Sequence, residues 1–158
     1  TNQVEADMIA AMVERIFRQV DHFDDSATVG VIVPYRNQIA TVRNAIDRYG
    51  IPALHSITID TVERFQGSQR DYIIYGLTVQ QRYQLNFLTD NVFEEDGTLI
   101  DRKLNVAMTR ARKHLTIVGN PDILAGSAVY RRLMDFMKSR GCYFNVACEK
   151  FCAGDFSV

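Results

Sequence analysis

Apolar residues recur every three or four positions over the first 20 residues, which is the spacing of one face of an α-helix. The polar stretch 24–26 breaks this pattern. The short apolar run 29–33, ended by Pro34, then predicts a strand buried on both faces. A second helical pattern follows, and Gly50 and Pro52 should end it. We therefore expect a helix, a buried strand and a second helix at the start of the chain.

Alternating strand and helix patterns continue through the rest of the chain. Strands are expected at 57–60, 72–77 and 115–119. Asp101 should cap a helix that carries the apolar positions Leu104, Ala107, Met108 and Ala111. Residues 80–100 have no clear period, and their Asp96-Gly97 pair favours a long excursion or a hairpin. Pro121 should open a short helix, and residues 128–140 predict another. This alternation predicts one α/β domain with a mostly parallel sheet and helices on both faces.

Composition excludes a membrane protein and a domain that binds nucleic acid through bulk charge. No run approaches the roughly 18 apolar residues of a membrane helix, and the opening TNQVEADM lacks the features of a secretory signal. It also lacks an initiator Met, so we expect a piece of a longer protein. The formal net charge is -1, whereas nucleic-acid-binding domains are commonly basic. Any such contact must come from local patches, and five positive side chains lie within residues 102–113.

Three cysteines, Cys142, Cys148 and Cys152, lie near the C-terminus. Their odd number fits a reducing compartment, the cytoplasm or a nucleus, better than a disulfide scaffold. Zinc binding is the weaker alternative, because no fourth ligand at suitable spacing is evident. We therefore expect no metal site in this chain.

Two arginines, Arg110 and Arg112, stand where a helical pattern passes into a buried-strand pattern. An arginine on a rigid element beside a cleft can neutralise charge that develops on a transferring phosphoryl group. Positions i and i+2 of a helix face different ways. We therefore assign one arginine to a nucleotide and the other to holding the neighbouring strand and turn. Taken alone, both also fit solvated arginines that interact with the helix dipole.

Two further polar segments follow strand patterns, at the edge where parallel sheets bind ligands. In segment 34–38, an arginine and an amide at a helix start can hold a phosphate, and Tyr35 can stack on a base. In segment 60–67, the Thr61 hydroxyl can donate to a phosphate, and Gly67 allows close backbone approach. Each segment alone also fits an ordinary turn. The chain has no Gly-Lys pair and hence no phosphate-binding P-loop of its own.

Together and in this order, the three segments resemble motifs of the Upf-like branch of superfamily 1B helicases. Residues 31–38, VIVPYRNQ, resemble motif IV, T/V-P-Y-x-x-Q. Residues 60–71, DTVERFQGSQRD, resemble motif V, T-V-D-x-F-Q-G-x-E-x-D. Residues 104–112, LNVAMTRAR, resemble motif VI, L-N-V-A-x-T-R-A-R, and residues 2–6 are similar to the N-x-x-E-A that opens the same domain. The resemblance covers residues 2–138.

This resemblance implies that residues 1–158 form the second RecA-like domain of a helicase. In the family, ATP and Mg²⁺ bind between this domain and an upstream P-loop domain, which supplies most of their ligands. The cleft opens and closes as the protein steps along single-stranded DNA or RNA. Arg110 would be the catalytic arginine finger. The other implied roles are nucleotide binding by Gly67 and Gln69, nucleic-acid binding by Pro34, Tyr35, Arg36 and Thr61, and coupling by Gln66 and Arg112.

We therefore expect the ATP-coupling and strand-gripping half of an ATP-dependent helicase or translocase. It would be an ATP hydrolase as part of its parent chain and inactive as an isolated fragment. The alternative is a RecA-like binding module with a degenerate cleft. Gln69 favours that alternative, because it replaces the family's acidic residue by an amide that accepts hydrogen bonds without carrying charge. An upstream Walker A motif would support the motor, and its absence would support the module.

Overall fold

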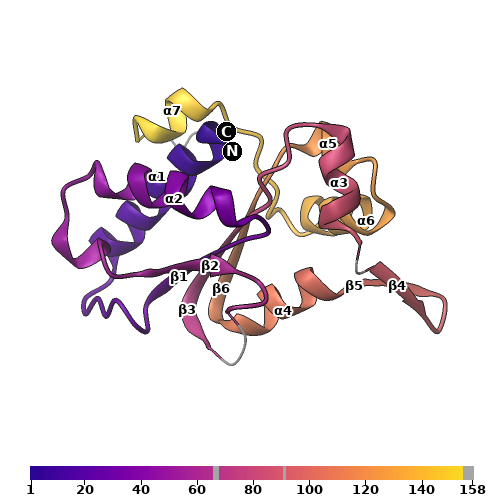
Figure 1. Ribbon diagram of the computed structural model, residues 1–158, viewed down its shortest axis with the longest axis horizontal. Coiled ribbons are helices and arrows are strands. Elements are labelled where there is room, and N and C mark those ends of the chain that lie inside the picture. The colour runs from indigo at the N-terminus through magenta and orange to yellow at the C-terminus, as the bar shows by residue number, and fades with distance from the viewer. Residues whose placement is uncertain (66–67, 91, 155–158) are drawn as a thin grey trace.

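A four-stranded parallel sheet forms the centre of the computed structural model, which describes residues 1–65, 68–90 and 92–154 (Figure 1). The strand order is β2-β1-β3-β6, and all three pairs are parallel. The strands are β1 (Val29–Val33), β2 (Thr58–Thr61), β3 (Arg70–Gly76) and β6 (Ala111–Val118). The predicted α/β class with a mostly parallel sheet is confirmed.

Helices cover both faces of this sheet, as the sequence predicts. One face is covered by α1 (Gln3–Gln19) and α2 (Arg36–Asp47), with the short α7 (Cys148–Cys152) packed on α1. The other face carries α3 (Arg82–Leu88), α4 (Arg102–Arg110), α5 (Pro121–Leu124) and α6 (Ala128–Ser139). A 3₁₀ turn, η1 (Pro52–Leu54), follows α2. In the part of the chain that the structure describes, no helix combines the length and apolar character needed to cross a bilayer.

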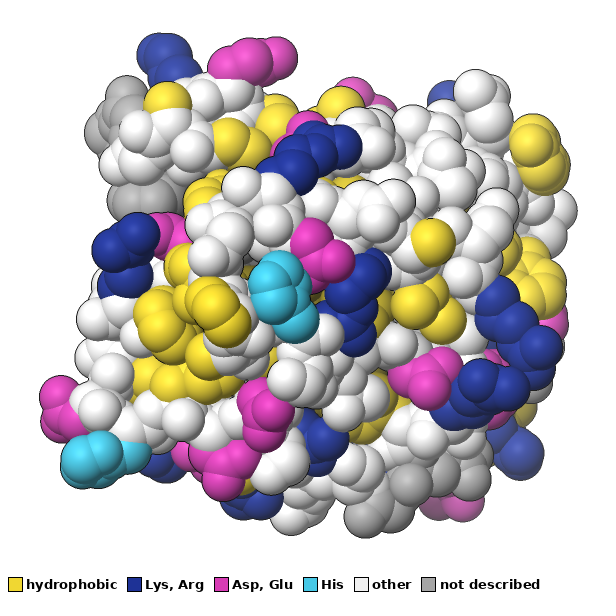
Figure 2. All heavy atoms as spheres, turned by 60° about the vertical axis from the view of Figure 1, so that its left-hand side comes forward, with side chains coloured by type: hydrophobic (Ala, Val, Ile, Leu, Met, Phe, Trp, Pro, Cys, Tyr) yellow, Lys and Arg dark blue, Asp and Glu magenta, His cyan; other side chains and the backbone are white. Residues whose placement is uncertain are grey.

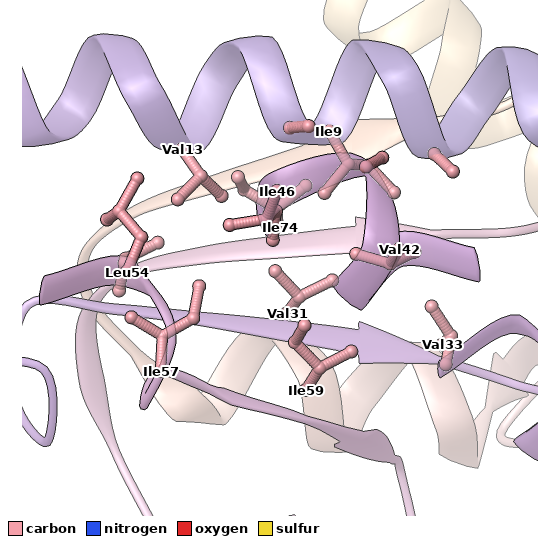
Figure 3. Close-up of a cluster of buried hydrophobic side chains, with 14 of the residues drawn as sticks. Ile9, Val13, Val31, Val33, Val42, Ile46, Leu54, Ile57, Ile59 and Ile74 are labelled. Atoms are coloured by element: carbon pink, nitrogen blue, oxygen red, sulfur yellow. The ribbon is translucent and has the colours of Figure 1, made fainter. Parts of the chain in front are cut away.

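The two faces of the sheet build two separate apolar clusters, because side chains alternate along each strand. Val31 and Ile74 face α1 and α2, whereas Ile32, Ile73 and Tyr75 belong to the cluster on the opposite face. Figure 3 shows the first cluster, in which side chains of α1 reach down onto those of α2 and the strands. Every residue of β1 is buried, as its continuous apolar run predicts for a central strand.

The main correction to the sequence prediction lies where α4 meets β6. The apolar spacing placed Ala111 and Arg112 in a helix, with the strand beginning at residue 115. Instead, α4 ends at Arg110 and β6 begins at Ala111, which is the parallel partner of Arg70 in β3. Pairing with β3 therefore overrides the helical pattern, and Arg110 and Arg112 belong to different elements. Asp101 caps α4 as predicted, accepting a hydrogen bond from the Leu104 amide.

The aperiodic stretch 80–100 contains both a helix and a hairpin. The helix α3 has only seven residues, too few to establish a period in the sequence. The hairpin pairs β4 (Val92–Glu95) with β5 (Thr98–Asp101), as the Asp96-Gly97 pair favours. Both turn residues have positive φ, 51° and 76°, which a tight hairpin turn requires. The hairpin projects away from the main sheet on the right of Figure 1.

Gly30 in β1 provides a test of how tightly motif V packs on the sheet. A Cβ atom at this position would lie 2.5 Å from Cζ of Phe65 and 3.0 Å from Cγ of Arg70. Gly30→Ala should therefore lower the free energy of unfolding by about 1–3 kcal/mol, although alanine by itself favours a strand by about 0.5–1 kcal/mol. Urea denaturation measures this loss. Adding Phe65→Leu should recover part of it, and an unchanged stability in Gly30→Ala would contradict the packing described.

Candidate nucleotide and nucleic-acid sites

The predicted site residues that the structure describes lie toward two opposite edges of the sheet. Pro34 and Thr61 follow or end β1 and β2 at the carboxyl edge, where Val33 pairs with Thr61. Arg110 and Gln69 lie at the amino edge, where Arg70 pairs with Ala111. Since β3 spans seven residues, the two edges are about 20 Å apart. Segment 62–69 of motif V connects the carboxyl edge of β2 with the amino edge of β3.

At the amino edge, the structure brings motif V next to motif VI. The Gln69 amide Nε2 donates a hydrogen bond to the carbonyl oxygen of Thr109, at 3.1 Å. Arg110 follows directly as the last residue of α4, half-buried. Its Nε is buried and has no hydrogen-bond partner among the described residues. Such an orphaned donor fits an anionic ligand. Gln66 and Gly67, the other two residues predicted here, lie outside the described residues.

Arg112 makes contacts within the domain. Its Nε donates to Oδ1 of Asp71 at 2.9 Å, and its Nη2 donates to the carbonyl oxygen of Ala27 at 2.8 Å. Lys113 lies 3.7 Å from the other oxygen of Asp71. The hydrogen bond from Arg112 holds the pKa of Asp71 below its usual value, and the charge of Lys113 adds to this effect. These contacts join β6, β3 and the turn before β1, which fits the holding role assigned to one of the two arginines.

Arg70 positions the end of motif V, a role that the sequence reasoning missed. This side chain is only 8% exposed. Its Nη1 donates to the carbonyl oxygen of Gln69 at 2.8 Å and to Oγ of Ser68 at 2.6 Å. Its guanidinium also lies 5.4 Å from the ring centroid of Phe65. Arg70 thereby fixes the backbone that presents Gln69 to motif VI. The signal in the sequence was an arginine where a buried strand begins, a position that should otherwise be apolar.

At the carboxyl edge, the predicted nucleic-acid-binding residues of motifs IV and V differ in how exposed their side chains are. Pro34 is buried, and Thr61 is only 4% exposed. Tyr35 is half-buried, and its hydroxyl donates to the carbonyl oxygen of Gln84 at 2.8 Å. Arg36, the first residue of α2, is exposed. The side chain of Arg36 is therefore the one in this group that is most open to a phosphate, while Pro34 and Thr61 can offer mainly backbone.

A network of buried polar side chains stabilises the carboxyl edge of the sheet. Gln38 uses both atoms of its amide on Asn2: it accepts from the Asn2 amide and donates to the Asn2 carbonyl oxygen, both at 2.8 Å. The Asn2 side chain caps α1 and donates to Glu5 at 2.8 Å and to the carbonyl oxygen of Thr78 at 3.1 Å. The residues of the N-x-x-E-A resemblance thus connect α1, α2 and the end of β3 through hydrogen bonds.

Thr78 adopts a strained conformation inside this network. Its φ is 71°, a left-handed value that is costly for a β-branched residue. The Thr78 amide donates to Oε1 of Glu5 at 2.8 Å, so the network holds this conformation from both sides. Glu5 itself is buried, and burial raises its pKa from 4.5 to about 7, against the opposing effect of the hydrogen bonds from the backbone amides.

The charged side chains and the cysteines are the remaining groups that could bind a ligand. Acidic and basic side chains are interspersed over the face shown in Figure 2, in agreement with the net charge of -1. No three His, Cys, Asp or Glu side chains within the described ranges come together to hold a metal ion. The three cysteines are free thiols, and Sγ of Cys148 lies 3.8 Å from Sγ of Cys152.

Comparison with known proteins places this chain among helicase sequences. Residues 1–122 match the family model described as an AAA domain. The chain is 32% identical over 141 residues to Helicase sen1 of Schizosaccharomyces pombe, an alignment that covers 88% of this chain and 8% of that protein. It is 36% identical over 118 residues to a regulator of nonsense transcripts 1 homolog of Drosophila melanogaster, covering 71% of this chain and 9% of that protein. The chain therefore spans less than a tenth of the length of these two relatives.

Proposed function

The chain belongs to the AAA-domain family of Upf-like superfamily 1B helicases, and we propose that it is the second RecA-like domain of an ATP-dependent helicase or translocase. In the parent protein it would complete an ATP site with an upstream P-loop domain and hold single-stranded DNA or RNA. The observation that carries this proposal is the contact between the Gln69 amide and the Thr109 carbonyl oxygen, at 3.1 Å. It joins motifs V and VI beside an arginine with a free buried donor.

Arg110 is the proposed catalytic residue. A guanidinium presents several donors in a fixed plane, which suits the charge that spreads over the oxygens of a transferring phosphoryl group. The end of a helix followed directly by a sheet strand holds this group rigidly, so little reorganisation is needed during the reaction. Gln69 would accept a hydrogen bond from a nucleotide hydroxyl through its side-chain oxygen. A magnesium ion, held mainly by the upstream domain, would neutralise phosphate charge when bound.

Motif V is the proposed connection between the ATP site and the nucleic acid. Segment 62–69 runs from Thr61 at the carboxyl edge to Gln69 at the amino edge. Val62 and Phe65 of this segment are buried in the apolar cluster on one face of the sheet, so the side chains of these two residues are held by the core. Arg70 and Arg112 anchor its far end. A shift at the nucleotide can therefore be transmitted to the residues that grip the strand, which is the coupling role proposed for Gln66 and Arg112.

The test is ATP hydrolysis by the full parent protein, with and without single-stranded DNA or RNA. We expect single-stranded nucleic acid to stimulate ATP turnover, because the proposed nucleotide-binding and nucleic-acid-binding residues lie on one rigid sheet. The isolated 158 residues should not hydrolyse ATP, since no P-loop is present to hold the β-phosphate. Absence of turnover in the parent protein under all conditions would contradict the proposal.

The second candidate is a RecA-like binding module without catalysis. Gln69 favours it, because a neutral side chain replaces the family's acidic residue beside the nucleotide. This candidate predicts that the parent protein binds nucleic acid or protein with no ATP turnover. An upstream sequence with neither a Walker A lysine nor a Walker B acid would support it.

A further inference from the structure

The helix α3 presents aromatic side chains at the edge where β3 ends. It begins six residues after Gly76, the last residue of β3, and buries Leu85 and Leu88 in the domain. Tyr83 and Phe87 lie four positions apart and therefore share one face of this helix. Tyr83 is 73% exposed and Phe87 is 48% exposed. Two large aromatic groups thus stand at the edge that also carries motif IV.

Contacts with motif IV and α4 fix α3 in place. The rings of Tyr35 and Phe87 are stacked, with their centroids 4.9 Å apart. The ammonium group of Lys103 lies 4.1 Å from the centroid of Phe87 and donates to the Phe87 carbonyl oxygen at 3.0 Å. It also pairs with Asp90 at 3.2 Å, although the Lys103 side chain is only 4% exposed. Phe87 is therefore occupied by internal partners and serves as an anchor.

Tyr83 remains the open aromatic side chain of this face. It directly precedes Gln84, whose carbonyl oxygen accepts the hydrogen bond from the Tyr35 hydroxyl at 2.8 Å. A groove of about 570 Å³ runs beside it between α3 and α5, lined by Arg82, Tyr83, Leu85, Asn86, Asp122 and Ile123. A groove of this size matches small ligand sites. It has one aromatic wall, apolar flanks and an exposed amide that can hydrogen-bond.

We propose that Tyr83 and the groove between α3 and α5 bind an unpaired nucleobase of a single-stranded nucleic acid. Tyr83 would stack on the base, and Asn86 would hydrogen-bond to its edge. Arg82 and Arg36, both exposed, would contact the phosphates on either side. Aromatic stacking beside cations is how proteins bind single strands without sequence preference. This combination of ring, amide and guanidinium groups favours a nucleic acid over a purely apolar partner.

This proposal rests on the proposed function, since it extends the track of the strand from motif IV onto α3. The test uses the full parent protein and a fluorescent oligothymidylate, with binding measured by anisotropy at constant salt. Tyr83→Ala should weaken binding about tenfold or more, whereas Tyr83→Phe should bind like the wild type. Tyr49→Ala is the matched control, because Tyr49 is also exposed and lies beyond the other end of α2. Its variant should bind normally.

The binding experiment distinguishes failure of the groove site from failure of the proposed function. A wild-type protein that binds no oligonucleotide would contradict the proposed function itself. A wild-type protein that binds, with Tyr83→Ala binding equally well, would overturn the groove site and leave the function standing. Photocross-linking of a 5-iodouracil oligonucleotide to the wild type gives a readout that does not depend on a folded variant. The cross-link should fall on the peptide that contains Tyr83, and cross-links confined to other segments would also overturn the proposal.

Discussion

Replacing Arg110 by alanine should lower the kcat of strand-stimulated ATP hydrolysis by roughly 10³-fold or more, the scale of an arginine finger. The reason is that its guanidinium would stabilise charge that is greatest in the transition state. The KM for ATP should change much less, because binding to the ground state relies mainly on the P-loop domain. Steady-state kinetics of the full parent protein, at saturating single-stranded DNA or RNA, measures both quantities.

A matched control lies on the same helix. Arg102 is an exposed arginine at the first position of α4, with its guanidinium 4.9 Å from the ring centroid of Phe93 in the hairpin. Arg102→Ala removes the same charge from the opposite end of α4 and should leave turnover near the wild-type value. If Arg110→Ala retained turnover within a few-fold of the wild type, Arg110 would not be the finger.

The stability of the domain should fall as the pH rises from 4.5 to about 7, because of Glu5. Its pKa is raised by burial to about 7 in the folded state, whereas 4.5 is its ordinary value. Between these two values the folded state holds a proton that the unfolded state has released. Stability therefore decreases with pH across this window, by up to about 3 kcal/mol. Below it this stabilisation is fully present, and above it the stabilisation is lost.

Urea denaturation of wild type and Glu5→Gln across this pH range tests the effect. Glutamine has a similar shape and cannot ionise. The free energy of unfolding of Glu5→Gln should therefore lack the part of its decrease with pH that Glu5 causes in the wild type. Glu94→Gln is the control, since Glu94 is exposed on the hairpin and the same charge is removed there. Parallel pH profiles for the wild type and Glu5→Gln would show that Glu5 does not titrate in this window.

The sequence predicted the elements of this fold well where one signal was strong and local. The apolar run of β1 and the three- and four-residue spacing of α1 correspond to elements of the structure. The prediction was wrong at the junction of α4 and β6, because the helical pattern continues past Arg110 to Arg112 while pairing with β3 begins at Ala111. The sequence also did not predict α3, because its seven residues are too few to show a helical period. Contacts with Tyr35 and Lys103 hold this helix in place.

The candidate site was less predictable than the fold. Motif spacing identified the segments and the strand ends that carry them, but it could not show that the Gln69 amide meets the carbonyl oxygen of Thr109 at the amino edge of the sheet. The close packing of Phe65 on Gly30 and the hydrogen bond from Arg70 to the carbonyl oxygen of Gln69 depend on contacts that no local pattern reveals. The internal hydrogen bonds of Tyr35 and Arg112 could not be predicted from the sequence either, because their partners lie at least 41 residues away along the chain.

The position of β6 at the side of the sheet has a consequence for association between molecules. Its outer backbone groups have no neighbouring strand in the four-stranded sheet, and an eight-residue edge strand is a template on which another copy of a protein can aggregate. Arg112, Lys113 and His114 are exposed along it. Two copies that met edge to edge would bring Arg112 and Lys113 of both copies together, and these charges would repel one another. Arg112 and Lys113 thereby also disfavour edge-to-edge aggregation of the domain, independently of ATP.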